Sequence, residues 1–214
     1  MEGVRLVRLQ VALDLLEKNK ALEIAKKCSE AGAHIIEAGT PLIKSEGIGV
    51  VTDLKRIAPG RKIVADMKTM DTGYLETKLA AEAGADMVSI LGAADNNTIR
   101  EALKAGREFG VEIVCDLINV QNPVERAKEL ERMGVDYVAL HLGIDQQKNS
   151  EYPYPILRKL CEELRIPVVA AGGLDDEKVV EVARAGAEIV IVGSFITKSD
   201  DPGLATKRIM NVLR

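Results

Sequence analysis

A short motif recurs four times along this chain of 214 residues at nearly constant spacing. Each copy is a small residue or methionine followed by glycine and a mainly apolar run. The copies start at Ala31, Ala83, Met133 and Ala185, so they lie 52, 50 and 52 residues apart. Glycine favours the left-handed backbone that ends a helix, and an apolar run after it indicates a buried strand. The motif therefore predicts four helix-to-strand transitions.

Four further apolar runs lie about halfway between these copies, at residues 9–13, 63–65, 113–115 and 168–171. Amphipathic segments such as 97–109 and 175–185 separate the runs. One strand plus one helix needs roughly 25 residues, and near-continuous apolar strands are typical of a parallel sheet buried on both faces. Eight such units predict a TIM (βα)8 barrel, a single α/β domain over residues 1–214. The rival, a doubly wound open sheet, lacks its dinucleotide fingerprint after the first strand.

Composition limits the partners. The net charge of −4 gives no reason to expect a nucleic acid or an anionic membrane. No apolar run approaches the roughly 18 residues that span a bilayer. Cys28, Cys115 and Cys161 are odd in number and far apart in apolar patterns, which favours reduced core thiols and a cytoplasmic setting over disulfides or a metal cluster.

Polar side chains gather where the predicted strands end, and in a barrel those carboxyl ends form the active-site mouth. The set, in chain order, is Asp14, Glu37, Asp66 with Lys68 and Asp71, Asp116 with Asn119, and His141. The second histidine, His34, lies at the other end of its strand, where we expect it on the surface. The mouth is therefore predicted to carry the chemistry.

Four acids in this set, Asp14, Glu37, Asp66 and Asp71, face one lysine. Such a cluster is short of positive charge unless a cation neutralises it. Carboxylate oxygens without cysteine select Mg²⁺ or Mn²⁺ over zinc, and Glu37 and Asp66, on adjacent strands, could hold one ion together. The alternative is that Asp71 or Glu37 merely caps the helix that follows it.

Lys68 and His141 are the candidate proton-handling groups. Among carboxylates Lys68 should stay protonated, which favours a fixed cation or proton donor over a Schiff-base nucleophile. A histidine can take and return a proton near neutral pH. The alternatives are a plain ion pair for Lys68 and a structural histidine at position 141.

Glycines follow the last two predicted strands, Gly172 with Gly173 and Gly193 before Ser194. In βα barrels this region commonly holds phosphate through backbone N–H groups, and Ser194 could add a hydroxyl. Turns also need glycine for their own backbone reasons.

With these residues in order, the chain resembles the orotidine monophosphate decarboxylase suprafamily, and within it the 3-hexulose-6-phosphate synthase family. The likeness covers nearly the whole chain, and the segments that carry it are residues 9–14, 37–41, 65–71, 91–92, 116–120, 141–145, 171–173 and 192–194. It implies a Mg²⁺-dependent aldol reaction that joins formaldehyde to ribulose 5-phosphate through an enediolate, and its reversal. It also implies that Glu37 and Asp66 hold the metal, that His141 transfers the proton and that Lys68 lies near the oxyanion.

The resemblance further implies a homodimer in which Asp71 reaches across to the partner's site. Two departures narrow the activity. Orotidine decarboxylases carry a lysine where this chain has Glu37, and sugar-acid decarboxylases carry arginines near the positions of Gly143 and Ser194. The first alternative is thus a decarboxylase of the 3-keto-L-gulonate 6-phosphate type, and the second is a barrel that binds a sugar phosphate without turning it over.

Overall fold

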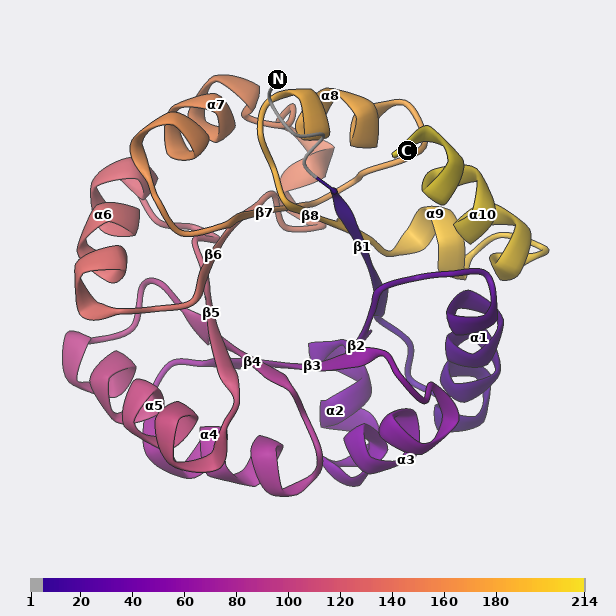
Figure 1. The fold of residues 1–214 in the computed structure, drawn as a ribbon, viewed down its shortest axis with the longest axis horizontal. Helices are drawn as coiled ribbons and strands as arrows, with labels where there is room; N and C mark the ends of the chain where they lie inside the picture. Colours follow the sequence, from indigo (N-terminus) through magenta and orange to yellow (C-terminus); the bar gives the residue numbers. More distant parts are fainter. Residues whose placement is uncertain (1–5, 214) are drawn as a thin grey trace.

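The computed structural model describes residues 6–213, which form one closed parallel barrel with helices around it (Figure 1). The predicted fold class is confirmed. Strands pair in chain order and β8 closes on β1. The strands are β1 (Arg8–Leu13), β2 (Ile35–Ala38), β3 (Lys62–Thr69), β4 (Met87–Leu91), β5 (Glu112–Asp116), β6 (Tyr137–His141), β7 (Val168–Ala171) and β8 (Ile189–Val192). Residues 1–5 and 214 lie outside the described part of the chain.

The helices form the outer ring of Figure 1, and two extra ones follow β2 and β8. They are α1 (Lys18–Glu30), α2 (Thr40–Glu46), α3 (Gly49–Ile57), α4 (Gly73–Glu82), α5 (Asn96–Phe109), α6 (Pro123–Met133), α7 (Tyr154–Glu163), α8 (Lys178–Arg184), α9 (Ser194–Thr197) and α10 (Pro202–Val212), with the 3-10 turn η1 (Gln146–Lys148) before α7. Within residues 6–213, no helix is long and apolar enough to cross a membrane.

The repeated glycines end helices as predicted. Gly32, Gly84, Gly134 and Gly186 all have φ between 90° and 106°. A side chain in this left-handed region is strained, so glycine is the residue that lets each helix stop and the chain turn into the next strand. The 50-residue repeat is thus the spacing of two βα units, and the glycine marks every second one.

Two layers of apolar side chains hold the barrel together. One packs between strands and helices, and the other fills the barrel interior with Ile35, Val64, Met87, Val114, Tyr137, Ala139, Val169 and Ile189. Because side chains alternate along a strand, the residues two positions further on from members of the inner layer also face inward, nearer the mouth. They include Glu37, Asp66, Ser89 and Asp116. The apolar layer below therefore supports a polar layer at the carboxyl ends.

His34 differs from its prediction. It is half-buried rather than a plain surface residue, and its Nδ1 accepts the N–H of Leu9 at 3.0 Å. Burial, then the charges of Arg61 and Arg8, lower the pKa of His34. Its place at the amino-terminal end of the barrel gives it a structural role, fixing the start of β1 against β2.

Candidate active site

A continuous hydrogen-bonded chain of charged groups crosses the barrel mouth from β3 to β6. Lys68 Nζ lies 2.8 Å from Asp66 Oδ2 and 3.2 Å from Asp116 Oδ2. The same Asp116 oxygen lies 2.8 Å from His141 Nδ1. The predicted proton-handling residues are thus brought together, and Asp116 is the group that joins them.

Asp66 is held on all sides. Its Oδ1 accepts from Ser89 Oγ at 2.6 Å and from Lys68 at 3.0 Å, while Oδ2 accepts from Thr40 Oγ1 at 2.8 Å and from Lys68. The side chain is only 8 % exposed, so these bonds offset the cost of burying a charge. The result is a carboxylate in one fixed orientation.

Lys68 reaches this position through an irregular backbone. The sequence predicts that Asp66 and Lys68 share a face because strand residues alternate. The register of β3 against β4 shifts between Ala65 and Thr69, however, and Lys68 has φ 47°. Its N–H donates to Ser89 Oγ at 3.0 Å, which helps to hold this strained residue. The two side chains do meet, but through a bulge and not through simple alternation.

The charge balance of the mouth explains its pKa shifts. Burial alone would lower the pKa of Lys68, but the charges of Asp66 and Asp116 outweigh it and raise that pKa, so the ammonium stays protonated. Burial would raise the pKa of Asp116, but the hydrogen bond and charge of His141, together with Lys68, lower it. Lys68 is therefore a fixed cation, as predicted from its neighbours, and it serves also as an ion-pair partner.

Glu37 and Asp14 are the acids of this cluster that form no ion pair with a cation within residues 6–213. Glu37 is buried, and Gln10 Nε2 donates to its Oε2 at 2.5 Å. Burial, then repulsion from Asp66 and Asp14, raise the pKa of Glu37 well above its ordinary value. Asp14 lies at the mouth and is in contact with solvent. Its pKa is raised also, first by the partial burial of its carboxylate and then by repulsion from Asp66. This side of the mouth is short of positive charge.

The donor set fits a magnesium ion bound mainly by two carboxylates. Among residues 6–213 no three histidine, cysteine or acidic side chains converge closely enough to hold an ion by themselves. Mg²⁺ commonly takes one or two carboxylates and completes its shell with water and substrate oxygens. Within residues 6–213 one Glu37 oxygen has no donor, whereas both Asp66 oxygens accept from Lys68, Oδ1 also accepts from Ser89, and the single Thr40 hydroxyl proton is shared between Oδ2 and the Asp66 carbonyl oxygen. Binding at Asp66 would therefore require Lys68 or Thr40 to give up one bond.

Asp71 lies apart from the cluster. Its side chain is exposed and Oδ1 accepts the N–H of Thr72 at 2.7 Å. It does not cap α4, because Thr72 occupies the N-cap position. Nor does Glu37 cap α2, whose N-cap is Gly39. The helix-capping alternatives for both acids are thus wrong.

The glycines of the last two units lie at the mouth on the far side from β3. Gly172 and Gly173 have φ of 114° and 63°, and both positions are crowded by the segment that follows β6. Asp14 lies between the two regions. A Cβ on Gly39 would be 2.2 Å from its Oδ1, and one on Gly193 would be 3.7 Å from its Oδ2. Ser194 is exposed and begins the four-residue helix α9.

Sequence reasoning gave no role to Asp116, Ser89, Thr40 or Gln10. Asp116 was visible as an acid at the end of β5, but its link to both Lys68 and His141 was not. Ser89 interrupts the apolar run Met87–Leu91, and a polar residue inside a buried strand is the signal that could have found it.

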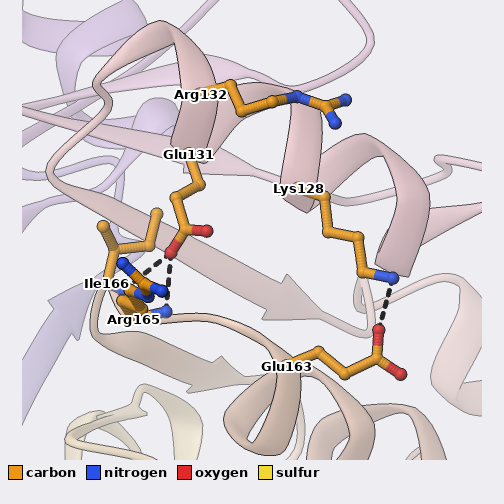
Figure 2. Close-up of a pocket in the computed structure, with 6 residues that line it drawn as sticks. All are labelled: Lys128, Glu131, Arg132, Glu163, Arg165 and Ile166. Carbon is orange, nitrogen blue, oxygen red and sulfur yellow. Dashed lines mark hydrogen bonds and ion pairs between the residues drawn. The ribbon is translucent and has the colours of Figure 1, made fainter.

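Two hollows on the surface lie away from this chain of charges. Figure 2 shows one of about 480 Å³ that α6 and the α7–β7 segment line, where Lys128 pairs with Glu163 and Glu131 accepts the N–H groups of Arg165 and Ile166. These bonds tie α6 to the next unit. The other, of about 450 Å³, lies beside the β4–α5 and β5–α6 loops and includes Asn119 and Arg126.

Known proteins share both the sequence and this architecture. Residues 7–209 match the family model for the orotidine 5'-phosphate decarboxylase / HUMPS family. The chain belongs to this family. Among its members, the 3-hexulose-6-phosphate synthase of Mycobacterium gastri is 41% identical over 203 residues, covering 95% of this chain and 98% of that protein.

Solved structures also share the fold of this chain. A crystal structure of a 3-hexulose-6-phosphate synthase aligns with a TM-score of 0.92 at 40% identity, covering 97% of this chain and all of the other. The Streptococcus mutans enzyme KGPDC, solved in complex with D-R5P, aligns with a TM-score of 0.91 at 26% identity, with 97% of each chain covered. The family resemblance seen in the sequence is confirmed.

Proposed function

We propose that this protein is a 3-hexulose-6-phosphate synthase, a lyase that joins formaldehyde to ribulose 5-phosphate by an aldol reaction and catalyses the reverse. One observation carries the proposal: the chain Asp66–Lys68–Asp116–His141 lies beside Glu37 at the mouth of a barrel that shares 41% identity with an enzyme of that name. The substrates are thus a sugar phosphate and formaldehyde.

His141 is the group that moves the proton. Asp116 engages its Nδ1, which leaves Nε2 to exchange a proton with substrate. In the forward direction Nε2 takes the proton from the carbon beside the ribulose carbonyl, and the electron pair moves onto the carbonyl oxygen. That carbon then attacks formaldehyde while the ribulose carbonyl re-forms, a carbon–carbon bond is made, and the former formaldehyde oxygen takes the proton that Nε2 carries.

Lys68 and the acids arrange the charge for this step. The ammonium of Lys68 is held in place by two carboxylates, and releasing one of its bonds to Asp66 would free an N–H for the developing oxyanion. Glu37 and Asp66 would hold Mg²⁺, or Mn²⁺, which would supply Lewis-acid stabilisation to the same oxygen. Asp14, between Gly39 and Gly193, faces the substrate from the other side. Backbone N–H groups of Gly172, Gly173 and Gly193, with the Ser194 hydroxyl, would bind the phosphate.

The test is consumption of formaldehyde by the purified protein with ribulose 5-phosphate and Mg²⁺, followed by chelation with EDTA. We expect turnover that EDTA abolishes and that added Mg²⁺ or Mn²⁺ restores. No formaldehyde consumption with any divalent ion would reject the proposal. Faster release of CO₂ from 3-keto-L-gulonate 6-phosphate would favour the decarboxylase alternative, and tight sugar-phosphate binding without turnover would favour the binding-only alternative.

We also propose that the protein acts as a homodimer in the cytoplasm. Three exposed apolar residues lie near Asp71 in the sequence: Met70 directly precedes it, and Leu75 and Leu79 follow on α4. Exposed apolar side chains grouped in this way are typical of an interface. Burying this patch against a second copy would carry Asp71 to the partner's mouth. The buried thiols of Cys28 and Cys115 support the reducing compartment.

Mixing two inactive variants tests the shared site. If Asp71 acts across the interface, a heterodimer of Asp71→Asn and His141→Ala has one site with both residues intact. Random exchange of equal amounts makes half the dimers mixed, so about a quarter of wild-type activity should return. No recovery after subunits have exchanged would show that Asp71 does not act across the interface.

A further inference from the structure

The segment after β6 packs directly on the glycine turn after β7. The N–H of Leu142 donates to Ala171 O at 3.1 Å. A Cβ on Gly172 would lie 2.3 Å from Leu142 O, and one on Gly173 would lie 2.8 Å from Gln147 Oε1. Both glycines therefore make room for this segment, which begins at the residue next to His141.

Gln147 spans the two elements with one side chain. It is half-buried on η1, its Nε2 donates to Leu142 O at 2.9 Å, and its amide rests against Gly173. A second contact with the turn comes from α8, where Lys178 Nζ donates to Gly173 O at 3.1 Å. The turn is thus contacted by the neutral amide of Gln147, from the β6–α7 segment, and hydrogen-bonded by the ammonium of Lys178, from α8.

These contacts leave the backbone N–H groups of the turn available to a ligand. The carbonyl oxygen of Gly173 is occupied by Lys178, whereas, within residues 6–213, neither the Gly172 nor the Gly173 N–H donates to another part of the protein. Free backbone N–H groups on a strained turn form an anion-binding concavity only while the turn keeps its shape. A turn that is already held in its binding shape loses less freedom when the anion binds.

We propose that Gln147 is a positioning residue for the phosphate end of the substrate site. It holds the Gly172–Gly173 turn so that its N–H groups face the phosphate, and it ties that turn to the strand end that carries His141. This inference rests on the phosphate site of the proposed function and adds a residue to it. Gln147 would act through the glycine backbone and not by touching the reacting atoms.

Gln147→Ala tests the role, with Gln147→Met as a variant that keeps the volume but loses the amide. Gln146→Ala is the matched control, because Gln146 is the adjacent glutamine and accepts the N–H of Gly143 within its own loop. We measure kcat and KM for ribulose 5-phosphate, the affinity for inorganic phosphate by ³¹P NMR, and the melting temperature. Losing the hydrogen bond that fixes the Gln147 amide on Leu142 O, and with it the placement of that amide against Gly173, should raise KM and the phosphate Kd about tenfold in both Gln147 variants. kcat should change less than about threefold, as expected for uniform binding.

The outcomes separate this inference from the proposed function. Phosphate affinity that is unchanged in Gln147→Ala and Gln147→Met, or lowered equally in Gln146→Ala, would overturn the role of Gln147. An equal fall in kcat with KM unchanged would overturn it too. If the wild-type protein consumes no formaldehyde but binds phosphate, and the Gln147 variants bind phosphate more weakly, the aldol reaction is rejected and the role of Gln147 stands.

Discussion

Replacing Asp116 by asparagine isolates the carboxylate that joins Lys68 to His141. The side chain is 6 % exposed, and its Oδ2 is shared between His141 Nδ1 at 2.8 Å and Lys68 Nζ at 3.2 Å. Asparagine keeps the shape and can still accept the N–H of Ile118, which now bonds Oδ1 at 2.8 Å. Its amide nitrogen cannot accept a hydrogen bond from either partner, so His141 loses the anion that orients its ring.

The expected fall in kcat can be estimated from the hydrogen bond between Asp116 and His141 that the substitution removes. A hydrogen bond to a charged group contributes about 1.5–3 kcal/mol. Lost from the transition state, that energy lowers kcat roughly 10- to 150-fold. The effect should be smaller than that of His141→Ala, which removes the general acid–base itself and should cost about a hundredfold to ten-thousandfold.

The assay is steady-state formaldehyde consumption against pH. Asp136→Asn is the matched control, because that carboxylate accepts the N–H of Ile113 at the opposite end of β5. We expect kcat to fall in Asp116→Asn, with KM for ribulose 5-phosphate nearly unchanged, and no such fall in the control. A kcat within twofold of wild type would refute the role of Asp116, and so would a loss in Asp116→Asn that persists in full when His141 is already alanine.

Three further predictions concern metal binding and stability. Asp66→Asn should lower Mg²⁺ affinity and kcat together, measured by Mg²⁺ titration of activity and by calorimetry; a loss of kcat with unchanged Mg²⁺ affinity would contradict the assigned ligand. Thr77 is fully buried and its hydroxyl lacks a partner within residues 6–213, so Thr77→Val should raise the free energy of unfolding by about 1–3 kcal/mol. Thr206→Val loses the hydrogen bond to Pro202 O and should lower the free energy of unfolding. Urea titration measures both changes, and changes of the same sign in the two variants would contradict the role given to the Thr77 hydroxyl. His34 has a lowered pKa in the folded protein, so the unfolded chain binds more protons and stability should fall as pH drops through the pKa of the unfolded histidine, towards the folded value. His34→Asn should remove this component of the pH dependence, and an unchanged difference in unfolding free energy between pH 8 and pH 5 would count against it.

The barrel could be derived from the sequence because its signals are local and repeated. A glycine after every second amphipathic segment, short apolar runs of three to five residues and a period near 50 depend on neighbours along the chain only. The same holds for the place of the site, because every strand of a parallel barrel delivers its carboxyl end to one mouth. Asp14, Glu37, Asp66, Lys68 and His141 were therefore all found as strand-end residues.

The pairing of those residues was decided by the tertiary structure. Lys68 reaches Asp116, 48 positions away, only because β3 bulges and Lys68 takes a positive φ, which no local periodicity encodes. The contact of Gln147 with Gly173 likewise depends on how closely two neighbouring units pack. Sequence patterns determine which end of a strand a side chain occupies. Barrel closure, register and packing determine which charges then share a proton or an ion, because those distances are set between segments far apart in the chain.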